Sequence, residues 1–268
     1  MTLGIVIITK GNIPILTKCI DSIINTTSQD YTIYIGDTGS TQDEIDALKR
    51  YLKNCNICLS RVKLIQFNRY GFAYCNNTII RDYVTEDLVL MCNNDIEVID
   101  NCVDEMVELF NTKKNIGSVG CRLLYPQNGS VQHAGQIAKV VRDRAGRPFL
   151  AVTHRGLRTN NKYNSTWEKV MGNTAGFCMV SRDRFHEIGM LNESYNECFE
   201  DVEFNMRLLS EGYDNYYADW LTCFHHESLT RNKSSEKNIQ SRRDHVNTLT
   251  PFFNSLNLDT KQLILSFV

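Results

Sequence analysis

The sequence predicts an α/β protein with a mostly parallel central sheet flanked by helices. Two observations carry this prediction. Short apolar runs rich in β-branched residues, typical of strands buried on both faces, alternate with segments whose apolar residues recur at i, i+3, i+4 and i+7, typical of helices with one buried face. The alternation repeats four times within about the first 110 residues, and strands separated by helices pair in parallel through right-handed crossovers.

The first strand is expected at residues 3–8, a continuous and mostly β-branched run. Residues 11–14, Gly-Asn-Ile-Pro, then open a helix. Three further strands are expected at residues 31–35, 62–67 and 88–91. A helix is expected after each of these strands. The first covers residues 43–53, the second runs from the residue after Gly71 to Tyr83, and the third contains the apolar stripe Val103, Met106, Val107 and Phe110.

Beyond Ile116 short apolar pieces lie among Gly, Asn and Arg; they cover residues 118–124, 131–137 and 177–180. Residues 142–171 are expected to form a long polar loop, and loops of that length tend to be functional or disordered. A helix at 202–211 and a strand at 213–217 follow. Near the end we expect a basic helix around Arg242 and Arg243, and an apolar finish at 263–268 that is either a docked helix or a cut point.

The composition indicates an ordinary globular protein, with 42% hydrophobic residues available for a core. A net charge of −2 creates no field that would recruit nucleic acid or an anionic membrane. No apolar run approaches the roughly 18–20 residues of a membrane span. Residues 1–8 lack the basic start of a signal peptide, so we expect a cytoplasmic protein.

Most of the ten cysteines favour free thiols over disulfides. Seven lie in apolar runs, where a free cysteine acts as a small hydrophobic residue: Cys19, Cys75, Cys92, Cys102, Cys121, Cys178 and Cys223. Cys55 and Cys58 form a single Cys-x-x-Cys pair, and zinc is its alternative interpretation.

Polar residues stand at the carboxyl ends of all four predicted parallel strands: Thr9 and Lys10, Asp37, Asn68, and Asp95. Ligands of open α/β sheets bind at these ends. Asn93-Asn94-Asp95 suits a nucleotide and a metal, because a carboxylate on Mg²⁺ or Mn²⁺ can bridge the cation to a diphosphate. Alternatively, Asp and Asn end strands as turn formers, and Asp100 caps the next helix.

Two downstream segments offer further chemistry. Glu200 and Asp201 stand at the start of a predicted helix, where they either cap the helix or supply a general base. His225 and His226 end an apolar run. Neighbouring strand residues point to opposite faces, so at most one should face a site as a Mn²⁺ ligand. The alternative is a hydrogen-bonded histidine at a sheet edge.

The ordered set of motifs resembles family 2 glycosyltransferases of the GT-A fold, in their rhamnosyltransferase-like branch. The matching segments run in family order from about residue 3 to 231: Thr9-Lys10, Gly36-Asp-Thr-Gly-Ser40, Asn68 to Asn77, Leu90 to Asp95, Val131-Gln-His-Ala-Gly135, Ala175 to Met179, Phe199 to Leu208 and His225 to Ser228. This resemblance implies a Rossmann-like sheet, a smaller mixed acceptor-side sheet and C-terminal helices. It also implies one domain over 1–268, with a nucleotide-binding half (1–115), an acceptor-binding and catalytic half (116–231) and a helical extension (232–268).

The resemblance implies metal-assisted transfer, with inversion, of a sugar from a UDP- or dTDP-sugar to a hydroxyl of a glycan acceptor. Asp201 would be the base and Glu200 its neighbour, and Asp95 with His225 or His226 would hold Mn²⁺ or Mg²⁺. The nucleotide sugar would contact Thr9, Lys10, Asp37, Asn68, Gly71, Asn77, Asn93 and Asn94. Trp167 and Arg155 are candidates for the acceptor, since an aromatic face suits a sugar ring; a surface loop with a buried Trp would look the same.

Many GT-A enzymes carry Asp where this chain has Asn93, which predicts low metal affinity. Two other functions remain open. A degenerate domain would bind nucleotide sugar or glycan without turnover. A nucleotidyltransferase would also place carboxylates and a metal at strand ends, although it typically needs a basic Gly-rich loop near the first strand, where only Gly11 stands. Other domains of a longer glycan-assembly protein are further candidate partners.

Overall fold

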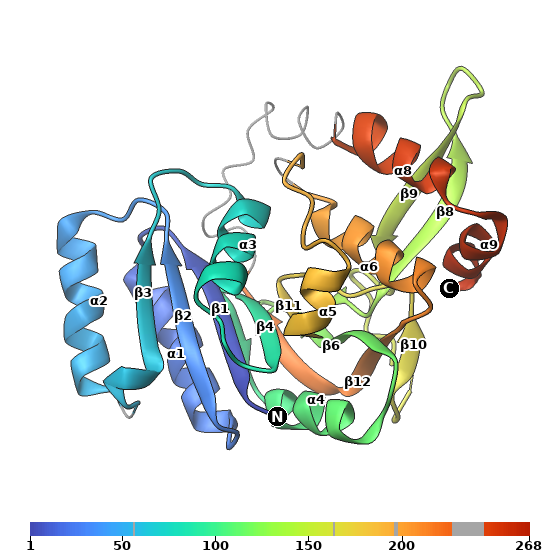
Figure 1. The fold of residues 1–268 in the computed structure, drawn as a ribbon. Helices are drawn as coiled ribbons and strands as arrows, with labels where there is room; N and C mark the ends of the chain where they lie inside the picture. Colours follow the sequence, from blue (N-terminus) through green and yellow to red (C-terminus); the bar gives the residue numbers. More distant parts are fainter. Residues whose placement is uncertain (56, 163, 196–197, 227–243) are drawn as a thin grey trace.

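The computed structural model describes residues 1–268 except 56, 163, 196–197 and 227–243. Its main sheet runs β10-β12-β6-β11-β4-β1-β2-β3, with β5 added to β12 and β7 to β6, and β8 and β9 form a separate hairpin (Figure 1). The strands are β1 Leu3–Thr9, β2 Tyr31–Asp37, β3 Val62–Gln66, β4 Leu88–Asn93, β5 Ile96–Val98, β6 Ile116–Leu124, β7 Val131–His133, β8 Gln136–Arg142, β9 Pro148–His154, β10 Glu168–Val170, β11 Phe177–Ser181 and β12 Asp214–His225.

The helices of the first half follow the strands as the sequence predicts, and β1 pairs in parallel with both β2 and β4. The helical segments of the whole chain are α1 Ile13–Thr26, α2 Gln42–Asn54, η1 Leu59–Arg61, α3 Phe72–Asp82, α4 Cys102–Thr112, α5 Arg182–Glu187, α6 Glu200–Ser210, η2 His245–Leu249, α8 Thr250–Ser255 and α9 Leu258–Ser266. The helix α2 begins with a capping box in which Thr41 and Glu44 satisfy each other's backbone N–H groups. The α/β class and the mostly parallel sheet are confirmed.

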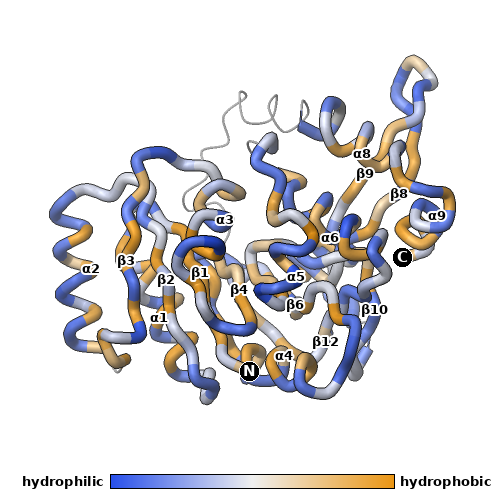
Figure 2. The backbone as a smooth tube through the Cα atoms, in the orientation of Figure 1, coloured by the Kyte–Doolittle hydropathy of each residue, from blue (hydrophilic) through white to orange (hydrophobic). Residues whose placement is uncertain are grey.

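Alternation along the buried strands divides the core between the two faces of the sheet. Leu3, Ile5 and Ile7 of β1 pack with α1, α2 and α4 on one face. Val6 packs on the other face with α3, α5 and α6. Figure 2 shows the hydrophobic stretches along the central strands and the hydrophilic residues in the loops and along α2. Seven cysteines are buried, as their apolar surroundings predict.

The expected loop at 142–171 is wrong for much of its length. Residues 148–154 form β9, which pairs antiparallel with β8 over seven residue pairs from Gln136–His154 to Arg142–Pro148, and residues 168–170 form β10. The hairpin packs with α6, α8 and α9 in a third apolar cluster, which includes Leu150 and Ile264. The apolar end of the chain is therefore a docked helix.

The predicted strand at 213–217 is longer than expected, because β12 continues to His225. The predicted basic helix around Arg242 and Arg243 lies outside the described residues. Asp100 does not cap α4, because this helix begins after Asn101 and has no side-chain cap. The carboxylate of Asp100 instead accepts a hydrogen bond from the backbone N–H of Thr222 at 2.9 Å. In the described part of the chain, every helix is too short or too polar to cross a bilayer.

Candidate active site

A cavity of about 780 Å³ opens where the carboxyl ends of β1 and β4 meet the start of α6 and the end of β12. Its walls include the strand-end residues Thr9, Lys10, Asn93, Asn94 and Asp95 and the downstream residues Glu200, Asp201 and His225. Segments more than a hundred residues apart in the sequence therefore line one cavity. This is the place where open α/β sheets bind ligands.

The end of β1 is tied to the ends of its two neighbours by polar contacts. Asn94 donates from Nδ2 to Thr9 Oγ1 at 2.9 Å, and Thr38 donates from Oγ1 to the carbonyl of Thr9 at 3.0 Å. Lys10 is exposed and borders the same cavity. These contacts fix the rim of the cavity and leave the positive charge of Lys10 at its edge, where it suits a phosphorylated ligand.

Asp95 and His225 form a pair that fits a divalent cation. Their side chains are 8% and 12% exposed, and Asp95 Oδ1 lies 3.1 Å from His225 Nε2. Adjacent octahedral ligands held about 2.1 Å from a small cation lie about 3 Å apart. Carboxylate oxygen and imidazole nitrogen together suit Mn²⁺, and Mg²⁺ through the oxygen. The donor set therefore fits the metal that the sequence implies.

Gly176 keeps space open beside this pair. A Cβ atom there would lie 3.2 Å from Asn93 Nδ2 and 3.6 Å from His225 Cε1. The backbone of Gly176 also accepts a hydrogen bond from Asn93 N–H at 2.8 Å. A glycine at this position lets the backbone approach the two side chains closely.

Asp201 is held at the cavity wall by backbone groups from two elements. Its Oδ2 accepts from the N–H of Ala175 at 3.0 Å, and its Oδ1 accepts from the N–H of Val202 at 2.7 Å. Two residues earlier, directly before α6, Phe199 has φ 82°, a left-handed conformation that costs a non-glycine residue about 1–3 kcal/mol. Fixed carboxylates and strained backbone of this kind occur at functional sites.

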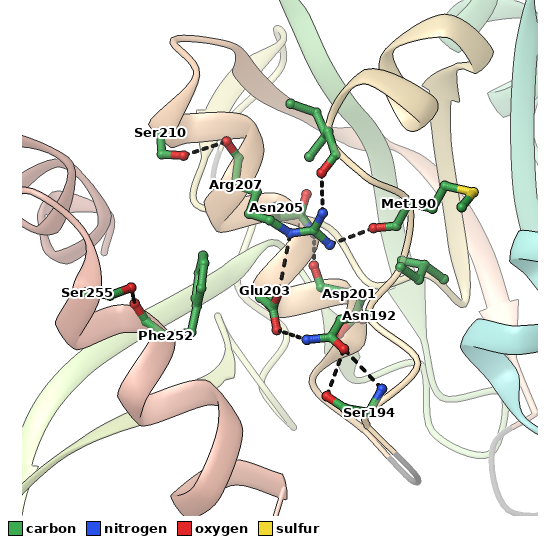
Figure 3. A network of polar contacts seen from close by, with 12 residues as sticks. Met190, Asn192, Ser194, Asp201, Glu203, Asn205, Arg207, Ser210, Phe252 and Ser255 are labelled. Atoms are coloured by element: carbon green, nitrogen blue, oxygen red, sulfur yellow. Dashed lines mark hydrogen bonds and ion pairs between the residues drawn. The ribbon is translucent and has the colours of Figure 1, made fainter.

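The helix that carries Asp201 is anchored on its far side by the network in Figure 3. Asn192 donates to Glu203 Oε2 at 2.9 Å, and Glu203 Oε1 lies 3.3 Å from Arg207 Nε. Arg207 in turn donates to the backbone carbonyls of Ile188 and Met190. These contacts fix α6 relative to the preceding loop, so the position of the Asp201 carboxylate is defined by the fold.

Four of the residues predicted to contact the nucleotide sugar lie outside the cavity wall: Asp37, Asn68, Gly71 and Asn77. Asn77 is buried and clamps a neighbouring loop: its amide donates to the carbonyl of Leu191 at 2.8 Å and accepts from the Leu191 N–H at 3.0 Å. Asp37 is 2% exposed and accepts hydrogen bonds from Ser40. Asn68 and Gly71 flank the lining residue Tyr70 but are not themselves in the wall.

The second histidine turns away from the cavity, as strand alternation predicts for one of the pair. His226 Nε2 lies 2.8 Å from Glu97 Oε2, and Lys18 lies 2.7 Å from the same carboxylate. Burial alone would raise the pKa of Glu97, but the interactions with Lys18 and His226 together outweigh burial and lower it. His225 is therefore the histidine that can act with Asp95.

The structure does not bring the two predicted acceptor residues to the cavity. Trp167 packs edge-on against Trp220, with ring centroids 5.1 Å apart, beside the hydrophobic core. Arg155 is 7% exposed and pairs with Glu168 at 2.8 Å. Both were predicted from an aromatic ring and a charge in an apparent loop; strand pairing instead gives each of them a structural partner.

The sequence interpretation missed a second group of lining residues: Tyr70, Phe72, Tyr125, Gln132, Gln136, His154 and Phe199. Gln132 lies within the motif Val131 to Gly135 and Gln136 directly follows it, so the motif was the available signal. His154 lies in the cavity wall because β9, which it ends, pairs with β8. It contacts His133, whose Nδ1 lies 2.6 Å from its own; burial, and then His154, lower the pKa of His133 well below its ordinary value of 6.5.

The fold is that of GT-A glycosyltransferases. The chain belongs to glycosyl transferase family 2, whose family model matches residues 4–189. It is 28% identical over 233 residues to the O-antigen biosynthesis protein RfbC of Myxococcus xanthus, covering 85% of this chain and 17% of that protein. It is also 28% identical over 249 residues to the uncharacterized protein y4gI of Sinorhizobium fredii, covering 90% and 26%. The chain thus spans about a quarter or less of these relatives.

Solved structures share the fold at low sequence identity. GalNAc-T7 with UDP, GalNAc and Mn²⁺ aligns with a TM-score of 0.67 and 15% identity, over 91% of this chain and 48% of that one. The mannosyltransferase PcManGT of Pyrobaculum calidifontis, in complex with GDP-Man and Mn²⁺, aligns with a TM-score of 0.64 and 14% identity, over 98% and 67%. TarS of S. aureus aligns with a TM-score of 0.62 and 12% identity, over 99% and 70%.

Proposed function

We propose that the chain is an inverting, metal-assisted glycosyltransferase that moves a sugar from a UDP- or dTDP-sugar to a hydroxyl of a glycan acceptor. The observation that carries the proposal is the joint placement of Asp95, His225 and Asp201 around one cavity. Asp95 and His225 would hold a divalent cation, which would supply positive charge for a diphosphate. Asp201 is a fixed carboxylate with lone pairs left for an acceptor hydroxyl.

In the proposed reaction the residues of this chain divide the work between donor and acceptor. Lys10 offers a positive charge near the diphosphate, and Asn94 and Thr9 order the rim on which the nucleotide rests. Asp95 and His225 would hold a divalent cation, which would supply positive charge to neutralise the leaving diphosphate. Asp201 takes the proton from the acceptor hydroxyl as that hydroxyl attacks the anomeric carbon from the face opposite the diphosphate.

The relatives support the substrate classes of this proposal. Two of the similar structures contain Mn²⁺ with UDP or GDP-Man, and one relative takes part in O-antigen biosynthesis. Rhamnose is our candidate sugar, from the resemblance to the rhamnosyltransferase-like branch. The acceptor contacts, first expected at Trp167 and Arg155, are proposed instead at His154 and Gln136, which border the cavity.

The experiment is a panel of UDP-, dTDP- and GDP-sugars with and without Mn²⁺, scored for donor binding and for release of nucleoside diphosphate. The proposal expects one nucleotide class to bind with Mn²⁺ and to release its diphosphate when a glycan acceptor is added. Absence of binding by every donor would refute it. Donor binding without release of nucleoside diphosphate in the presence of acceptors would favour the alternative function, a degenerate domain without turnover, with which Asn93 is consistent.

A further inference from the structure

The ring of His225 has a polar partner at each nitrogen. Nδ1 lies 2.5 Å from Gln132 Oε1. Nε2 lies 3.1 Å from Asp95 Oδ1 and 3.3 Å from Asn93 Nδ2. Gln132 therefore contacts the histidine on the side away from Asp95.

The orientation of the Gln132 amide follows from its second contact. Its Nε2 donates to the backbone carbonyl of His225, at the long distance of 3.5 Å. Turning the amide over would set its oxygen against that carbonyl oxygen, and two acceptors repel each other. The oxygen of Gln132 thus faces the ring and accepts a hydrogen bond from Nδ1–H.

A proton on Nδ1 leaves the neutral ring with its lone pair on Nε2. That lone pair faces Asp95 Oδ1, 3.1 Å away, which is the direction a cation ligand needs. Asp95 is also an acceptor and competes for the ring proton, but Gln132 Oε1 is closer, at 2.5 Å, and the Asn93 amide can donate to Nε2 when no cation is present. The opposite tautomer would point an N–H at the site. Which nitrogen of a histidine binds metal is set in this way by the partner of the other nitrogen.

The fold holds Gln132 firmly in this position. It is 7% exposed and lies on β7 between Val131 and His133, which are 0% and 1% exposed. Both β7 and β12 pair with β6, at Leu124 in each case, so the Gln132 side chain reaches His225 across one intervening strand. Packing therefore leaves Gln132 little freedom to release the ring.

We propose that Gln132 is a positioning residue that fixes the tautomer and orientation of His225 and so sets the affinity of the site for a divalent cation. This inference rests on the proposed function, because it assumes that Asp95 and His225 hold the cation. Loss of an outer partner of this kind lowers metal affinity about 10–100-fold. The role also explains a side chain that neither the nucleotide nor the acceptor chemistry requires.

The first test measures the ring itself by ¹⁵N NMR of the metal-free protein, at a pH where His225 is neutral. Wild type should show hydrogen on Nδ1, and Gln132→Leu should show a mixture or the opposite tautomer. Gln132→Glu loses the hydrogen bond to the His225 carbonyl but keeps an oxygen facing Nδ1, so hydrogen should stay on Nδ1. Gln66→Leu, at an exposed position at the end of β3, is the matched control and should not change the ring.

The second test is a titration with Mn²⁺ in the presence of UDP, read by electron paramagnetic resonance. Gln132→Leu should weaken Mn²⁺ binding 10–100-fold, and Gln132→Glu should stay closer to wild type. Hydrogen on Nε2 in wild type, or Mn²⁺ binding by folded Gln132→Leu within twofold of wild type, would overturn the inference. If Gln132→Leu does not fold, the wild-type tautomer and Gln132→Glu decide. Failure of wild type to bind Mn²⁺ with any nucleotide would instead refute the metal site on which the proposed function depends.

Discussion

The substitution Asp201→Asn separates the proposed base from the fold that holds it. The carboxylate accepts backbone N–H groups with both oxygens, from Ala175 at 3.0 Å and Val202 at 2.7 Å. An amide has one acceptor oxygen, so one N–H loses its partner at a cost of about 1–3 kcal/mol in the free energy of unfolding. A domain of ordinary stability, about 5–15 kcal/mol, stays folded after such a loss.

The catalytic loss should be larger than the structural loss. Removing a general base lowers the rate about 10²–10⁴-fold, which is about 3–5 kcal/mol of the activation barrier. Initial rates of nucleoside diphosphate release at saturating acceptor give kcat, calorimetry gives the Kd of the donor, and urea unfolding gives the stability. We expect kcat to fall at least a hundredfold with the donor Kd nearly unchanged.

Asp183→Asn is the matched control, because its side chain is 90% exposed. It should leave kcat, donor Kd and stability as they are in wild type. The assignment of the base is refuted if Asp201→Asn transfers sugar within tenfold of the wild-type rate. A raised donor Kd with unchanged kcat would make Asp201 a donor-binding residue instead.

The remaining predictions concern the histidines and the thiols. His225→Ala should weaken Mn²⁺ binding at least tenfold in a titration with UDP, whereas His226→Ala, which removes only a partner of Glu97, should change it less than twofold. Burial lowers the pKa of His133 in the folded state below its ordinary value of 6.5, so between the two pKa values only the unfolded state binds the proton. The free energy of unfolding should therefore be greatest above pH 6.5. Below pH 6.5 it should fall by up to about 1.4 kcal/mol per pH unit until the folded pKa is reached. Urea unfolding of wild type and of His133→Gln checks this, and equal slopes would contradict it. Cys58 is exposed, and hydrogen bonds from Ser60 lower its pKa; an alkylating reagent should modify it first, and mass spectrometry finding a buried cysteine modified earlier would disprove the assignment.

The sequence was sufficient for the central sheet because its strands are buried on both faces. A continuous apolar run such as residues 3–8 has few alternatives, and the polar residue that ends it marks the rim of the site. Thr9, Lys10, Asn93, Asn94 and Asp95 all line the cavity for this reason. The alternation of side chains predicts that at most one histidine of the pair faces a site, and of the two only His225 lies in the cavity wall.

The second half was harder to predict because its contacts are long-range. The strands β8 and β9 are partly exposed, so polar residues interrupt their apolar pattern and the pairing is visible only in three dimensions. The partners of Trp167, Arg155 and Asn77 depend on such pairings. A residue type that suits a ligand suits a buried structural contact equally well, and local sequence does not separate the two.

The short peptide at residues 174–176 touches both halves of the site. Ala175 holds the carboxylate of Asp201, and Gly176 accepts from Asn93 beside the proposed metal pair. A change in the length of this peptide would alter the separation between departing diphosphate and arriving hydroxyl. The hairpin of β8 and β9 borders the cavity without taking part in that spacing. For an engineer who wants a new acceptor, the hairpin is accordingly the segment to diversify, and residues 174–176 are the segment to keep.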